Sequence, residues 1–142
     1  RPVILFFFSS RRRHTRYISL TVVQTCLSDL GGEVRALDGG IMGEATLDFI
    51  SQFRLDYGIL GISGIDMDGS LLEFDYHEAR TKRAIIENSR CVMLVTDHSK
   101  FGRNAMVNLG KMDLIHYLFT DKQPPDSVKQ IIDKYDVHLE LC

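Results

Sequence analysis

The sequence predicts an α/β fold, with a mainly parallel open sheet and helices on both of its faces. Short apolar runs of strand length alternate along the chain with segments whose apolar residues recur every three or four positions. This alternation is typical of β-α-β units. Of the 142 residues, 44% are hydrophobic and 25% are charged, as in ordinary globular domains. One folded domain is therefore expected rather than a disordered chain.

The first helix and strand are predicted in the stretch that ends near residue 62. Glycines open the segment LDGGIMGEATLDFISQF, in which Leu47 and Ile50 then recur at helical spacing. The run DYGILGIS predicts a buried strand over 57–62. The turn signal Asp68-Gly69 makes the following GIDMDGSL a loop.

A second helix is predicted in FDYHEARTKRAIIENSR. Asp75 and Glu78 have the spacing of a capping box. Glu78 and Lys82 form a favourable i,i+4 pair, and we expect Lys82 and Arg83 on a solvated face.

The rest of the chain predicts strand, strand, helix and strand. The continuous apolar run CVMLVTD is followed by the polar loop HSKFGRNAMVNLG and the strand HYLFTD. A helix in PPDSVKQIIDKY follows from its prolines and from apolar residues at i, i+3, i+4 and i+7. The alternating VHLEL predicts a final strand at a sheet edge.

Two polar loops follow strands that one helix connects, and they are the candidate binding site. Ligands of open parallel sheets bind beyond the carboxyl ends of the strands. The loops GISGIDMDGS and TDHSKFGRN are therefore expected to face one crevice. Cationic, hydroxyl and backbone N–H donors suit a phosphate ester, and aspartates accept from the hydroxyls of a polyol. The candidate effector-binding residues are Gly64, Asp66, Asp97, Ser99, Lys100 and Arg103.

Structural roles compete with binding at several of these positions. Asp66 and Asp68 are alternatively turn residues that bond their own backbone. Asp97 alternatively caps a turn or holds Lys100 in a local ion pair. A sugar-phosphate isomerase of this fold would need a general base; Asp66 and Glu73 could be proposed, but the sequence shows a partner for neither.

No cofactor and no metal site are expected. The five histidines and three cysteines lack the spacing of metal ligands. The cysteine pattern is not a disulfide framework, which fits a reducing cytoplasm. No stretch approaches the roughly 20 apolar residues of a membrane span, so we expect no membrane partner.

The segment 1–30 differs from the rest in charge. It carries five arginines and one aspartate, a net charge of +4, whereas residues 31–142 carry 12 Lys/Arg and 18 Asp/Glu, a net charge of −6. The stretch FFFSSRRRHTRY is open to readings as a nucleic-acid or membrane arm or as a disordered basic tail. It also resembles translated sequencing-adapter read-through, the interpretation we favour. We therefore assign 1–30 to a non-homologous segment.

Three motifs in order, GIDMDGSL, DYHE and DHSKFGR, give residues 31–142 a close resemblance to the effector-binding domain of DeoR-type bacterial repressors. The resemblance implies a sensor similar in fold to ribose-5-phosphate isomerase, without enzymatic activity, in a homo-oligomeric cytoplasmic repressor. It implies a small phosphorylated effector, glycerol 3-phosphate above all. In that broader fold group the D-x-S-K element, here Asp97, Ser99 and Lys100, lines the sugar-phosphate crevice.

The chain also departs from the family pattern. The helix-turn-helix that would contact operator DNA is not found, and neither is the D-x-G-T/S-T phosphate loop of the sensor. By this comparison we expect an N-terminally truncated fragment, residues 31–142 being the C-terminal part of the sensor domain.

Overall fold

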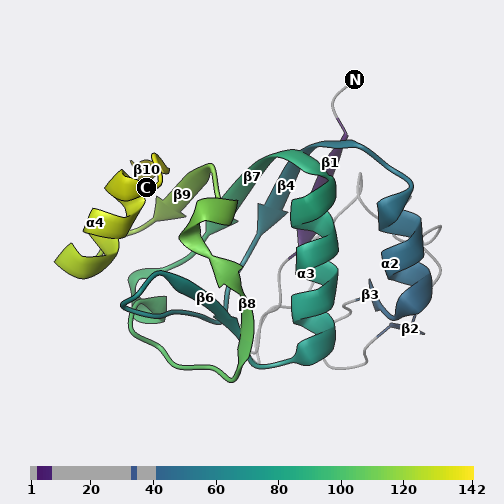
Figure 1. Cartoon of the computed structure of the whole chain (residues 1–142), viewed down its shortest axis with the longest axis horizontal. Helices are drawn as coiled ribbons and strands as arrows, with labels where there is room; N and C mark the ends of the chain where they lie inside the picture. The colour runs from purple at the N-terminus through teal and green to yellow at the C-terminus, as the bar shows by residue number, and fades with distance from the viewer. Residues whose placement is uncertain (1–2, 8–32, 35–40) are drawn as a thin grey trace.

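The computed structural model describes residues 3–7, 33–34 and 41–142. Its largest element is a five-stranded sheet in which every pairing is parallel (Figure 1). The strand order is β1-β4-β7-β9-β10. These strands span Ile4–Phe7, Leu55–Leu60, Ser89–Val95, Tyr117–Thr120 and His138–Leu141.

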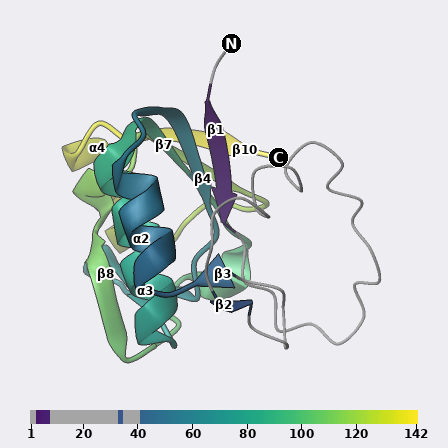
Figure 2. The same cartoon turned by 90° about the vertical axis from the view of Figure 1, so that its right-hand side faces the viewer.

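Three helices cover one face of this sheet, as Figures 1 and 2 show together. They are α2 (Glu44–Ser51), α3 (Tyr76–Asn88) and α4 (Asp126–Lys134). The alternation of the strands explains the layer, because Val92 and Leu94 of β7 are buried while Val95 is exposed. Ile85 of α3 and Ile132 of α4 belong to the same buried cluster as these strand residues. The α/β class and the parallel sheet are thus confirmed, and no helix covers the second face within the described ranges.

Smaller elements lie between the main strands. A three-stranded antiparallel sheet joins β5 (Gly64–Ile65), β6 (Ser70–Glu73) and β8 (Val107–Lys111) in that order. The short strands β2 (Glu33–Val34) and β3 (Ile41–Met42) pair with each other. Two single-turn 3₁₀ helices, η1 (His98–Lys100) and η2 (Met112–Leu114), flank β8 along the chain.

The predicted order of helices and strands is confirmed from α2 to β10. The strands β5, β6 and β8 were not predicted, because their segments are polar and rich in turn residues. These strands are two to five residues long, and Gly64 and Gly110 (φ 155°) lie within them. Short strands with glycines give little periodic signal.

A further strand lies in the N-terminal segment. Residues Ile4–Phe7 form β1 and pair with β4, with Ile4 opposite Tyr57 and Leu5 opposite Gly58. Leu5 packs against the core. The rest of the arginine-rich segment, residues 8–32, lies outside the described residues, so our interpretation of it stays a prediction.

The Asp75 cap is confirmed, and one surface assignment is wrong. Asp75 Oδ1 accepts hydrogen bonds from the backbone N–H groups of His77 (2.7 Å) and Glu78 (3.2 Å), as a helix N-cap does. Lys82, however, is 1% exposed rather than solvated, and its ammonium is paired with Glu73. The expected pair with Glu78 is also present, at 3.9 Å. Arg83 is exposed as expected.

Candidate functional site

The two polar loops lie side by side at the carboxyl ends of β4 and β7. These strands are direct neighbours, with Leu60 opposite Leu94. The backbone N–H of Gly102 donates to the carbonyl of Ile65 at 2.7 Å, and Ile65 forms a parallel bridge with Phe101. The expected adjacency of the two loops at one edge of the sheet is therefore observed, and a binding crevice between them stays a prediction.

Gly64 of the first loop lies against the backbone of Arg103 in the second loop. A Cβ on Gly64 would overlap the carbonyl oxygen of Arg103, so this approach requires glycine. The Arg103 guanidinium lies over the ring of Phe74, with Cζ 5.1 Å from the ring centroid. This cation–π geometry keeps the exposed charge beside the loop pair.

Asp66 lies in the tight turn between β5 and β6. Its backbone N–H donates to the carbonyl of Ser70 (2.9 Å), and its Oδ1 accepts from the N–H of Met67 (2.7 Å). Asp68 Oδ1 accepts from the N–H of Ser70 at 2.9 Å. Hydrogen bonds from Ser70 lower the pKa of Asp68. The turn role is thus present for both aspartates, and effector contact by Asp66 stays a prediction.

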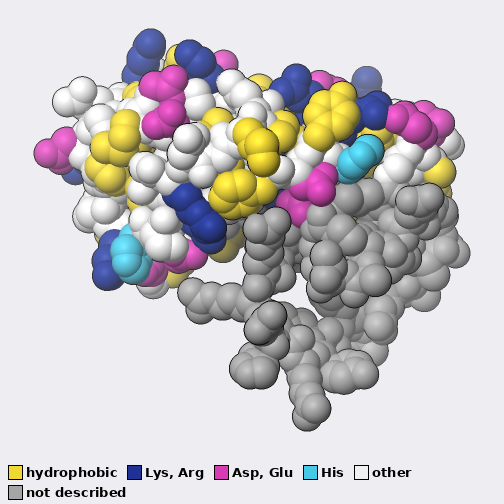
Figure 3. All heavy atoms as spheres, turned by 90° about the horizontal axis from the view of Figure 1, so that it is seen from below, with side chains coloured by type: hydrophobic (Ala, Val, Ile, Leu, Met, Phe, Trp, Pro, Cys, Tyr) yellow, Lys and Arg dark blue, Asp and Glu magenta, His cyan; other side chains and the backbone are white. Residues whose placement is uncertain are grey.

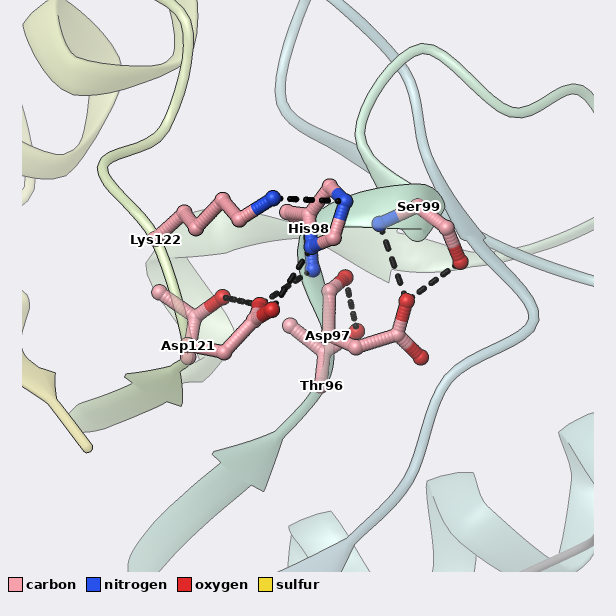
Figure 4. Close-up of polar contacts among 7 residues, drawn as sticks. Thr96, Asp97, His98, Ser99, Asp121 and Lys122 are labelled. Atoms are coloured by element: carbon pink, nitrogen blue, oxygen red, sulfur yellow. Dashed lines mark hydrogen bonds and ion pairs between the residues drawn. The ribbon is translucent and has the colours of Figure 1, made fainter.

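Asp97 caps the η1 turn that carries Ser99 and Lys100 (Figure 4). Its Oδ1 accepts from the backbone N–H of Ser99 (2.9 Å) and from the Ser99 hydroxyl. The hydrogen bond from that hydroxyl is the main cause that lowers the pKa of Asp97, and Lys100 lowers it further. A carboxylate held this way is ionised at neutral pH. Lys100 is half-buried and Ser99 is exposed.

Two carboxylates outside the predicted effector-binding set, Glu73 and Asp121, contact these loops. Glu73, at the end of β6, accepts from the hydroxyl of Ser63 in the first loop (2.6 Å) and pairs with Lys82. Asp121, directly after β9, contacts His98 of the second loop. One signal was available for Asp121: a Thr-Asp pair stands at the end of β9 (Thr120-Asp121) as one stands just after β7 (Thr96-Asp97), and both strands end at the same edge of the sheet.

Three further observations concern surface charge, metal ligands and membrane-spanning helices. On the face shown in Figure 3, Lys and Arg side chains are interspersed with Asp and Glu among the described residues. Within the described ranges, no three His, Cys, Asp or Glu side chains gather in a way that could hold a metal ion. No helix in the same ranges is both long and apolar enough to cross a membrane.

A parallel sheet with polar loops beyond the carboxyl ends of its strands is the arrangement in which open α/β domains bind their ligands. Residues 21–122 match the sequence model of the DeoR C-terminal sensor domain. The chain therefore belongs to the DeoR family and carries its sensor domain. The match begins inside the segment 1–30 that we assigned to no family, and the boundary at residue 30 stays a prediction.

Curated relatives agree with this assignment. The chain is 72% identical over 112 residues to the glycerol-3-phosphate regulon repressor of Escherichia coli, covering 79% of this chain and 44% of that protein. The Haemophilus influenzae protein of the same name is 57% identical over 79% of this chain and 43% of its own length. The E. coli HTH-type transcriptional repressor CsqR is 33% identical over 78% of this chain and 42% of its length. The chain thus spans less than half the length of these relatives.

Proposed function

We propose that this chain is the effector-sensing part of a cytoplasmic bacterial transcriptional repressor. We propose further that its effector is a phosphorylated polyol, with glycerol 3-phosphate as the first candidate. The observation that carries the proposal is the contact between the loops at Ile65 and Gly102. The relatives named for the glycerol-3-phosphate regulon support the choice of effector.

The chemistry of the crevice suits this ligand. A phosphate monoester carries a charge of about −1.5 to −2 near neutral pH. The Lys100 ammonium, the Ser99 hydroxyl and the N–H groups of the loop glycines would receive it. Asp66 and Asp97 would accept from the polyol hydroxyls. Arg103 would add positive charge at the rim.

The sensor would act without catalysis. Glu73, which an isomerase could use as its base, is 0% exposed and paired with Lys82, so it does not face the crevice. Effector binding would favour a state of the intact, homo-oligomeric repressor with low operator affinity. The size of that shift is limited by the difference in effector affinity between the two states. Operator DNA would be contacted by a helix-turn-helix that residues 31–142 do not supply.

Calorimetry tests the proposal. Residues 31–142 would replace the corresponding part of the E. coli repressor, and glycerol 3-phosphate would be titrated into this chimera and into the chain itself. Glycerol and inorganic phosphate are the matched controls, because each presents half of the ligand. We expect saturable binding of glycerol 3-phosphate to the chimera and much weaker binding of either half. Absence of binding, or turnover of a pentose or hexosamine phosphate, would overturn the proposal.

A further inference from the structure

Asp121 lies beside the η1 turn because β9 and β7 are parallel neighbours. Val95 is opposite Phe119, and the N–H of Thr96 donates to the carbonyl of Phe119 at 3.0 Å. The first residues beyond each strand therefore emerge at one edge of the sheet. Asp121 is the first residue after β9, so its carboxylate reaches the turn that follows β7.

Both oxygens of the Asp121 carboxylate are committed to His98. Oδ1 accepts from the backbone N–H of His98 at 2.6 Å, and Oδ2 lies 2.6 Å from the ring atom Nδ1. Lys122 contacts the opposite side of the His98 ring, with its Nζ 3.3 Å from Nε2. Figure 4 shows these three side chains on the side of the turn away from Ser99. The carboxylate thus contacts the turn through both the backbone and the side chain of one residue.

The η1 turn is held at two points of different kind. From within, Asp97 caps it through Ser99. From outside, Asp121 ties its first residue to a different strand, 23 positions away. A three-residue 3₁₀ turn has few hydrogen bonds of its own. An anchor on a neighbouring strand therefore limits how far Ser99 and Lys100 can move relative to the sheet.

We propose that Asp121 is the positioning residue of this turn: by fixing His98 it sets where Ser99 and Lys100 present their donors to the effector. The effector part of this inference rests on the proposed function. A hydrogen bond from His98 lowers the pKa of Asp121, so the anchor is ionised at neutral pH. The role proposed for Asp121 is to hold the turn through His98, not to contact the ligand.

Amide hydrogen exchange and calorimetry on the chimera test the inference. The variants are Asp121→Ala, Asp121→Asn and the matched control Asp133→Ala, which removes an exposed aspartate from α4. In Asp121→Ala we expect the His98 and Ser99 amides to exchange about 10-fold faster or more, since the turn opens locally. Glycerol 3-phosphate should bind about 10-fold more weakly, the order of one lost hydrogen bond. Asp121→Asn keeps an amide oxygen for the His98 N–H and should recover part of the protection.

The outcomes separate the two claims. Unchanged exchange at His98 and Ser99 in Asp121→Ala overturns the inference, whatever the ligand does. Faster exchange with unchanged affinity also overturns it, because the turn would then not present the effector donors. If the parent binds no glycerol 3-phosphate, the proposed function and the effector role fail together, and exchange alone decides whether Asp121 anchors the turn. Exchange that rises across the whole sheet would indicate general destabilisation and overturn the positioning role.

Discussion

The carboxylate of Glu73 and the ammonium of Lys82 form an ion pair whose side chains are 0% and 1% exposed. Glu78 adds a second carboxylate at 3.9 Å from the same ammonium. The second oxygen of Glu73 accepts from Ser63. This pair therefore links α3 to the first loop of the candidate site.

Removing the cation should cost more than removing one carboxylate. Lys82→Met leaves Glu73 and Glu78 buried without the ammonium, whereas Glu73→Gln leaves Lys82 beside Glu78. Breaking a buried ion pair by removing one partner costs about 3–5 kcal/mol. We therefore expect Lys82→Met to lower the free energy of unfolding by an amount near or above that range, and Glu73→Gln to lower it by less. Urea denaturation measures both. Lys129→Met, on the exposed face of α4, is the control and should change stability by less than about 0.5 kcal/mol; equal effects of the two lysine variants would contradict the account.

Replacing the cap of α3 should weaken the fold by a smaller amount. Asp75→Ala removes the acceptor for the N–H groups of His77 and Glu78. The expected loss is about 0.5–2 kcal/mol. Asp75→Ser should recover most of it, because a serine oxygen also caps. The measurement is the midpoint of thermal or urea unfolding. An unchanged midpoint in Asp75→Ala would show that the cap does not stabilise the fold.

The approach of the two loops should not tolerate a side chain at Gly64. In Gly64→Ala the added Cβ meets the carbonyl oxygen of Arg103, so the loops must separate. We expect this to lower the free energy of unfolding by about 1–3 kcal/mol. Gly102→Ala is the comparison variant. The added Cβ would lie 3.6 Å from Met67 Sδ, which is an ordinary contact, and only the φ of 72° at this position opposes the substitution. We expect it to lower the free energy of unfolding by about 1–2 kcal/mol. Calorimetry should show loss of effector binding in Gly64→Ala. Retention of parental affinity there would argue against a crevice between these loops.

Acid should weaken the fold partly through Asp97. Its pKa is lowered in the folded state, chiefly by the hydrogen bond from Ser99, against about 3.9 for an unfolded aspartate. Its contribution to stability is therefore present above that unfolded value and is lost as pH falls through the lower, folded pKa. Urea unfolding at a series of pH values should show a smaller decline below about pH 4 in Asp97→Asn than in the parent. Identical declines in the two proteins would mean that the hydrogen bonds of the ionised Asp97 carboxylate do not contribute to stability.

Local sequence patterns predicted the main elements but not the long-range pairs. The run CVMLVTD and the Asp75 cap identify β7 and α3 because their signals lie within one short segment. Lys82 appeared solvated because its helix neighbours are polar, whereas its burial depends on Glu73 on another element. The contact between His98 and Asp121 spans 23 positions, and it follows only from the order of strands in the sheet.

The candidate residues illustrate the same limit. Asp97, Ser99 and Lys100 could be grouped from the sequence because they share one turn. The expectation that the loops carrying Gly64 and Arg103 lie at one edge of the sheet followed from the strand-end rule for parallel sheets. The roles of Ser63 and Glu73 could not be predicted, because an antiparallel hairpin without a periodic signal brings them together.

The affinity of Lys100→Ala for glycerol 3-phosphate, beside that of Lys129→Ala, tests the central claim most directly. In the chimera, calorimetry should show Lys100→Ala binding about 10- to 100-fold more weakly, as expected for a lost hydrogen bond to a charged group. Lys129→Ala should bind like the parent. Parental affinity in Lys100→Ala would contradict the assignment of the effector to this crevice.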